Sequence, residues 1–147
     1  MDDVPAIPHD PDNWESRIGP LPPIARAQGV VYAGSHDGAP RIAMPPAEFL
    51  QGRPELLHGG AIGSLLEIAA VMTLRAYLRD GDHHMRLKPV NITIDYLRGG
   101  NMVMTYGAAR ITRIGRTLAN VEARIWQADA DKPIALAHLH YLVRPPK

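Results

Sequence analysis

The chain has 147 residues, no cysteine and a formal net charge of +1. This length fits one domain with a sizeable core. The lack of cysteine excludes disulfides, thiolate metal sites and a cysteine nucleophile, and it is compatible with a reducing cytoplasm. The near-zero net charge does not suggest nucleic-acid binding.

The first 23 residues form a proline-rich segment, with Pro at positions 5, 8, 11, 20, 22 and 23. Proline breaks helices and removes a strand donor, so neither a long helix nor an inner strand is expected there. We interpret residues 1–23 as an N-terminal arm anchored by Trp14 and Ile18, and residues 24–147 as the folded domain. The acidic start is unlike a secretory signal, so a cytoplasmic location is expected.

The next segment predicts short elements. Residues 23–28 suit one or two helical turns, because proline is favoured at a first helical position. Residues 30–36 and 41–44 flank Asp37-Gly38, a dipeptide that favours a tight hairpin turn, and they predict two short strands. Residues 47–57 are interpreted as an irregular link.

The longest regular stretch, residues 57–77, predicts a central helix. Its apolar residues fall on every side of a helical wheel, which is typical of a buried helix. A membrane span needs about 20 apolar residues and this stretch is the candidate, but Glu67 at its middle and Arg75 and Arg79 near its end argue against a span. We therefore expect a soluble protein that does not enter a membrane.

After a polar break at 79–84, four strands are predicted, at residues 88–98, 102–114, 116–126 and 133–143. Their apolar residues alternate with a period of two. Gly107 is interpreted as a bulge within the second of these strands.

The turns between these strands predict how the sheet is arranged. Glycine-rich tight turns at 99–101 and 115 indicate that successive strands are antiparallel neighbours. A helix buried on all sides requires a sheet that curls around it. A second copy of the chain is the economical cover for what the sheet leaves open.

The start of the predicted helix carries the first candidate chemistry. Backbone N–H groups in the first turn have no internal partner and lie at the positive end of the helix dipole. Gly59 and Gly60 leave these groups unshielded, so a carbonyl oxygen would be polarised there and an oxyanion stabilised, which suits acyl transfer. A bare Gly-Gly pair is also an ordinary helix start.

Glu67 is the single acid of the helix. A buried acid costs free energy unless it is paired or functional, so a catalytic role and a salt bridge with a strand arginine both stay open. Glu67 follows Gly59 by eight residues, a rise of about 12 Å and a rotation of about 80°. One glutamate does not comfortably serve a carbonyl at its own helix start over that distance. Joint action on one substrate therefore predicts a homodimer, with Gly59 from one subunit and Glu67 from the other.

Three segments together resemble the hotdog-fold acyl-CoA thioesterases of the phenylacetate-degradation type: HGGAIGSLLEIAA, TIDYLR and IGRTLANVEARIW. The resemblance covers residues 24–144. It implies an α+β hotdog fold, in which a curved antiparallel sheet wraps around one long central helix. It also implies hydrolysis of an acyl-CoA thioester to the free acid and CoA.

The resemblance implies roles for the matched helix residues. The Gly59 amide would polarise the thioester carbonyl, and Glu67 of the partner subunit would act as general base on water or as nucleophile. His58 would orient the helix start or the substrate, and Gly60 is counted with the substrate-binding residues.

Two departures from the family pattern are visible. Many members have aspartate where this chain has Glu67, and the extra methylene leaves the base and nucleophile roles open. Many members also place Asn or Gln six residues before the histidine, where this chain has Gly52. The neighbouring Gln51 is the candidate for that role, by a shift of one residue.

For the CoA moiety, the resemblance points to the Gly-Arg turn at Gly115-Arg116. Arg113 and Arg116 are candidates for the phosphates and Arg110 is a weaker one, with ordinary surface charge as the competing explanation. CoA is part of the substrate, so no separate cofactor is expected. His138 and His140 share a strand face but lack a placed carboxylate, so no metal is predicted.

Two other functions stay open. Hotdog dehydratases act on enoyl thioesters, but they typically have proline- and glycine-rich residues after their histidine, unlike His58-Gly59-Gly60. A dimeric acyl-CoA-binding module without activity is the non-enzymatic alternative. The sequence does not specify the acyl group, nor whether dimers pair into tetramers.

Overall fold

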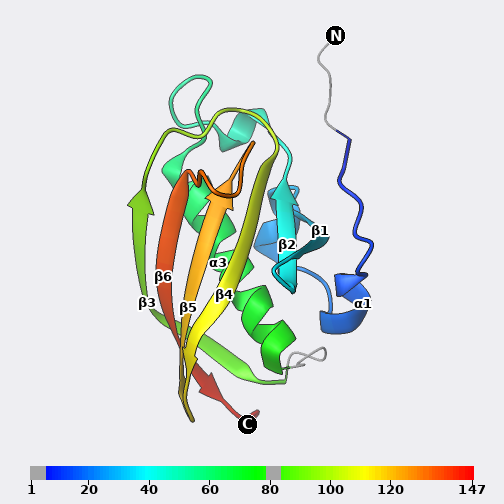
Figure 1. The fold of residues 1–147 in the computed structure, drawn as a ribbon, viewed down its shortest axis with the longest axis vertical. Coiled ribbons are helices and arrows are strands. Elements are labelled where there is room, and N and C mark those ends of the chain that lie inside the picture. The colour runs from blue at the N-terminus through cyan, green and yellow to red at the C-terminus, as the bar shows by residue number, and fades with distance from the viewer. Residues whose placement is uncertain (1–5, 79–83) are drawn as a thin grey trace.

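In the computed structural model, which describes residues 6–78 and 84–147, a six-stranded antiparallel sheet curves around one long helix (Figure 1). All but the last residue of the predicted polar break at 79–84 lies outside the described residues. The elements in chain order are α1 (Trp14–Ile18), α2 (Pro23–Ala27), β1 (Val31–His36), β2 (Ala39–Met44), the 3₁₀ helix η1 (Glu48–Leu50), α3 (Gly59–Leu78), β3 (Arg86–Tyr96), β4 (Thr105–Ile114), β5 (Leu118–Trp126) and β6 (Ala135–Arg144).

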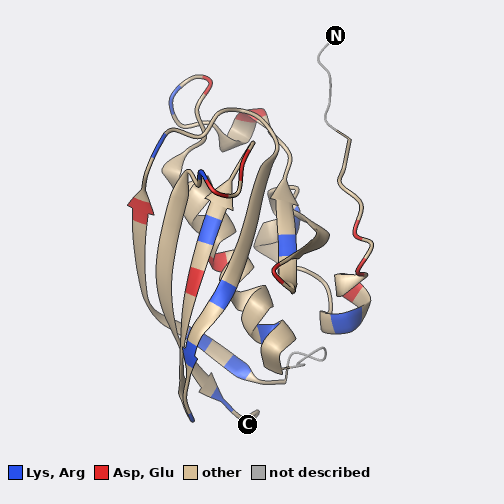
Figure 2. Ribbon diagram, viewed as in Figure 1, with Lys and Arg blue, Asp and Glu red and all other residues tan. Residues whose placement is uncertain are grey.

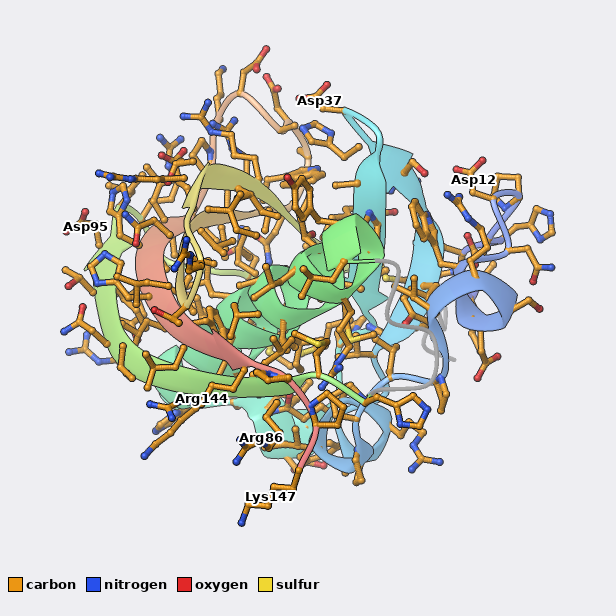
Figure 3. All side chains as sticks on the ribbon, turned by 90° about the horizontal axis from the view of Figure 1, so that it is seen from below. Asp12, Asp37, Arg86, Asp95, Arg144 and Lys147 are labelled. Carbon is orange, nitrogen blue, oxygen red and sulfur yellow. The ribbon has the colours of Figure 1, made fainter. Side chains whose placement is uncertain are left out.

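The long helix α3 crosses the hollow of the sheet, as the end-on view in Figure 3 shows. Its apolar residues pack against β2, β4, β5 and β6, whose inward side chains alternate with outward ones. This confirms the predicted central helix in a curved sheet. By length and mean hydropathy, 1.5, α3 would pass for a membrane span, but 56% of that window is buried inside the protein. A core helix passes the same test, so the finding is weak evidence for a span.

The strand order is β1-β2-β4-β5-β6-β3. The prediction that β3 and β4 are neighbours was therefore wrong, because β3 pairs with β6 at the far edge of the sheet. The glycines at 99 and 100 do not close a hairpin. Gly100 is buried, its carbonyl accepts a hydrogen bond from the Leu57 N–H at 2.9 Å, and an added Cβ would lie 3.0 Å from Ile134. The chain is thereby led across the end of the sheet before β4 begins.

The β1–β2 hairpin confirms its prediction. Asp37 and Gly38 both have positive φ, 51° and 80°, as a tight hairpin turn between twisted strands requires. The predicted bulge at Gly107 was wrong, because Gly107 pairs regularly with Ile42 and Ile125. An added Cβ there would lie 3.2 Å from Ile125, so this glycine permits close packing.

The N-terminal arm lies against the β1 edge of the sheet (Figure 1). Trp14 and Ile18 are each 3% exposed, which confirms them as anchors. The short helix predicted at 23–28 is also present, as α2.

Candidate functional site

His58 caps the start of α3, because it accepts hydrogen bonds from the first backbone N–H groups of the helix. The Ala61 and Ile62 N–H groups donate to the His58 carbonyl at 3.0 and 3.2 Å, and the Gly60 N–H donates to His58 Nδ1 at 2.8 Å. The imidazole thus acts as the side-chain acceptor of an N-cap, and Nδ1 carries no proton in this arrangement. Of the first four N–H groups of α3, that of Gly59 alone has no acceptor among the described residues.

Tyr96 at the end of β3 closes over the same helix start. Its hydroxyl donates to the Gly59 carbonyl at 3.0 Å, and its ring lies 3.5 Å from the place of a Cβ on Gly59. The contact fixes the first turn of the helix against β3. The Gly59 amide lies at the positive end of the dipole of a 20-residue helix.

Two glycines make room for the His58 imidazole. A Cβ on Gly60 would lie 2.9 Å from Nδ1 of His58, and a Cβ on Gly52 would lie 3.1 Å from the His58 Cα. The missing amide side chain at position 52 is thereby explained, because His58 occupies its space. Gln51 is engaged locally: its Oε1 accepts from the Glu55 N–H at 2.7 Å.

Glu67 is exposed on α3 and makes no hydrogen bond or ion pair with any described residue. The alternative of a salt bridge with a strand arginine is therefore absent from the described part of the chain. Glu67 and Gly59 lie on the same helix, eight residues apart. The single chain does not bring its own two catalytic candidates together.

Gly63, one turn before Glu67, packs against Ile94 and Tyr96 of β3. The outer edge of β3 has no neighbouring strand in the described chain. Ile92 and Tyr96 face the hollow of the sheet opposite Leu139 and Ala135 of β6, yet they are 40% and 56% exposed. Exposed apolar side chains next to a free strand edge are typical of a surface that a partner covers.

Tyr141 lies on β6 beneath this surface and is 1% exposed. Its hydroxyl has no hydrogen-bond partner in the described part of the chain. Burial, and then the negative charge of Glu67, raise the pKa of Tyr141 far above its ordinary value. The phenol is therefore a hydrogen-bond donor at neutral pH.

The predicted phosphate ligands lie at the other end of the sheet, on β4 and the β4–β5 turn (Figures 1 and 2). Arg113 lines a groove of about 1160 Å³ between β4, the C-terminal end of α3 and the β1–β2 turn. Arg110 lines the same groove but is paired with Glu122 at 3.3 Å. Arg116 is exposed in the turn.

His138 and His140 point to the convex face of the sheet, opposite Thr93 and Asn91 of β3. Among the described residues, no group of three His, Cys, Asp or Glu side chains is placed to hold a metal ion.

Sequence reasoning missed both tyrosines of the site. The alternation in β3 places Tyr96 on the face of Ile92, but nothing local shows that this face reaches the helix start. The alternation in β6 likewise makes Tyr141 an inward residue, without a signal that its hydroxyl lies near Glu67.

Comparison with known proteins identifies the family of this chain. The model of the thioesterase superfamily matches residues 55–134, more than half of the chain. The chain belongs to the thioesterase superfamily. Its curved sheet around one helix is the hotdog fold of that family, and membership supports thioester hydrolysis as the general activity. No curated protein matches the chain.

Solved structures of proteins from several bacteria are similar to this chain. A protein of Chromobacterium violaceum is 33% identical, with a TM-score of 0.64 and 82% of each chain covered. A phenylacetic acid degradation-related protein of Ralstonia eutropha JMP134 is 24% identical, with a TM-score of 0.72, covering 84% of this chain and 91% of the other. A Bacillus halodurans protein solved with CoA is 17% identical, with a TM-score of 0.75, covering 90% and 85%.

Proposed function

We propose that this superfamily member hydrolyses an acyl-CoA thioester, and that it works as a homodimer with two equivalent sites. In each site, the Gly59 amide of one subunit binds the carbonyl oxygen, and Glu67 of the partner subunit supplies the carboxylate that acts as general base or nucleophile. The observation that carries the proposal is Glu67 itself, an exposed carboxylate without a partner among the described residues on an otherwise apolar helix.

The free edge of β3 supports the homodimer. Two copies that pair along this edge about a two-fold axis continue one sheet and cover the exposed apolar residues of β3. Such pairing runs the two β3 strands antiparallel. The helix start of one subunit then lies at the end of the partner's sheet that carries Arg113 and Arg116.

The chemistry follows from these groups. The Gly59 N–H stabilises the negative charge that develops on the carbonyl oxygen, a donor of the kind that contributes on the order of 10²–10³-fold to rate. Glu67 accepts a proton from the attacking water, or attacks the carbonyl carbon itself and is released by water. In both routes the C–S bond breaks, the acid gains the water oxygen, and CoA leaves as the thiol.

We assign the phosphates of CoA to the arginines at the β4–β5 end of the sheet. The Bacillus halodurans neighbour was solved with CoA. Arg113 of this chain has no hydrogen bond or ion pair with the described residues and lines a groove, so its guanidinium is free for a phosphate. Arg116 is equally exposed at the adjoining turn.

The test is CoA release from a panel of short, long, aryl and hydroxyaryl acyl-CoAs. A thiol reagent suits it, because the chain has no cysteine and contributes no background. We expect turnover with one class of acyl group and a fall on the order of 10²–10⁴-fold in Glu67→Gln. Glu15→Gln, at an exposed glutamate of α1, is the matched control and keeps the wild-type rate.

The other outcomes separate the alternatives. Equal rates in wild type and Glu67→Gln would exclude Glu67 as the catalytic acid. Tight acyl-CoA binding without release by either protein would indicate a binding module, and hydration of an enoyl-CoA would indicate a dehydratase.

A further inference from the structure

The hydroxyl of Tyr141 is buried and has no hydrogen-bond partner among the described residues. Tyr141 lies on β6 opposite Ala119 of β5 and Pro89 of β3, and it belongs to the hydrophobic core. A phenylalanine would fill the same space and leave no polar atom unsatisfied. A buried hydroxyl without a hydrogen bond costs free energy. We therefore expect the Tyr141 hydroxyl to find an acceptor that is not within bonding distance among the described residues of the single chain.

Glu67 is the acceptor that the structure offers. Gly63, one turn before Glu67 on α3, packs against Ile94 of β3, and Tyr141 faces the same hollow from β6, opposite Pro89 of β3. After the larger effect of burial, the charge of Glu67 raises the pKa of Tyr141. The raised pKa keeps the phenol protonated. The carboxylate itself has no donor among the described residues, and three rotatable bonds let it turn from solvent towards β6.

The surroundings of this pair contain few competing groups. The neighbours of Glu67 one turn away on α3 are non-titrating residues, namely Gly63, Ser64, Ala70 and Val71. Arg75, two turns on, has an interaction of its own. The charged residues and histidines of the adjacent strands alternate with the inward set and point to the convex face: Lys88 and Asp95 of β3, His138 and His140 of β6, and Glu122 and Arg124 of β5. Tyr96 of β3 faces the hollow, and its hydroxyl donates to the Gly59 carbonyl. Figure 3 shows Asp95 pointing away from the hollow.

We propose that Tyr141 is a positioning residue for Glu67: its hydroxyl donates a hydrogen bond to the carboxylate and holds it towards the thioester once the partner subunit covers the site. This inference rests on the proposed function, because it assigns Tyr141 to the same site. A donor to the charged form favours the carboxylate over the acid, and it limits the rotamers of a long side chain. Covering by the partner strengthens the bond, since water no longer competes.

Tyr141→Phe tests this role, because it removes the donor and keeps the ring. With the best substrate of the panel, we expect kcat to fall about tenfold at little change in KM, as for loss of a hydrogen bond to a charged group. We also expect the acid limb of the pH profile of kcat to move upward by about half to one unit. Tyr106→Phe on β4, whose ring stacks on Trp126, is the matched control and changes neither quantity.

A readout without substrate separates this inference from the thioesterase itself. Carbon-13 NMR of protein labelled at glutamate carboxyls, with the Glu67 signal assigned by Glu67→Gln, follows the acid directly. We expect the pH midpoint of that signal to be higher in Tyr141→Phe than in wild type. An unchanged midpoint overturns the positioning role. If the midpoint differs between Tyr141→Phe and wild type but the wild type hydrolyses no thioester, the proposed function is overturned and the Tyr141–Glu67 hydrogen bond is still supported.

A second variant covers the case in which Tyr141→Phe does not fold. The Cζ signal of labelled Tyr141 is then compared between wild type and Glu67→Gln. A change in that signal supports the bond, and an identical signal in both proteins excludes it.

Discussion

The two edges of the sheet are finished in opposite ways. At the β1 edge the chain uses its own arm: the Trp14 indole N–H donates to Ser35 Oγ at 3.0 Å, and the Gly34 N–H donates to Asp10 at 3.2 Å. At the β3 edge no further strand of the described chain follows, and Ile92 stays 40% exposed.

This difference teaches where function is to be sought. At the closed edge these polar groups are paired, and the anchors Trp14 and Ile18 are buried. Three groups without a hydrogen-bond partner among the described residues lie at the open edge or beside it: the Gly59 amide, the Glu67 carboxylate and the Tyr141 hydroxyl. The buried Thr73 hydroxyl, which also lacks a partner there, lines the groove beside Trp14 and Arg17. Groups that a ligand or a partner can complete are expected at a functional surface, and this supports the site that we propose at the open edge.

Among the substitutions that test this difference between the two edges, Ile92→Asp is expected to have the largest effect on dimerisation and activity. The side chain is exposed in the single chain, so the monomer tolerates a charge there, whereas a dimer through β3 would bury it unpaired. We expect monomers by light scattering and a loss of activity on the order of 10²-fold or more. Ile24→Asp, at the 57% exposed residue of α2, is the control and stays dimeric. An active Ile92→Asp dimer would show that β3 is not the interface.

The substitution Gly59→Pro is expected to have the next largest effect on activity. Gly59 is the first helical residue, where proline fits and where it removes the one free N–H of the helix start. We expect activity to fall on the order of 10²–10³-fold with the fold retained.

The same variant tests whether two subunits share a site. Gly59→Pro mixed with Glu67→Gln forms heterodimers that hold one site with both groups intact. We expect activity to return on mixing and refolding, to about a quarter of wild type for random pairing of two equal pools. No recovery, with heterodimers present, would place both groups of a site in one chain.

Trp14→Ala tests the closed edge, where the expected effect is on stability alone. Loss of a buried tryptophan costs about 3–5 kcal/mol in the free energy of unfolding, measurable by urea titration. Dimer mass and kcat per dimer should stay unchanged. Arg17→Ala, which removes only the cation over the Trp14 ring at 3.9 Å, costs about 0.5–1 kcal/mol. A fall in dimerisation in Trp14→Ala would mean that the two edges are coupled.

Much of the fold was readable from the sequence. The apolar helix, the period-two strands and the Asp37-Gly38 hairpin were predicted correctly, because each depends on residues close together in the chain. The errors concern distant contacts. The glycines at 99 and 100 were interpreted as a hairpin turn, but Leu57 and Ile134 hold that segment in place, and Gly107 was interpreted as a bulge although the close approach of Ile42 and Ile125 explains it.

By itself, the sequence determined the central helix, the motif His58-Gly59-Gly60 with Glu67 eight residues after Gly59, and the resemblance that pointed to the family. For the described residues, only the tertiary structure decided that β3 ends the sheet, that the Gly59 amide alone is left free at the capped helix start, and that the Tyr141 hydroxyl is buried without a partner. The physical reason is that periodicity and motif spacing are local properties. Exposure, strand order and hydrogen-bond satisfaction depend on residues far apart in the chain.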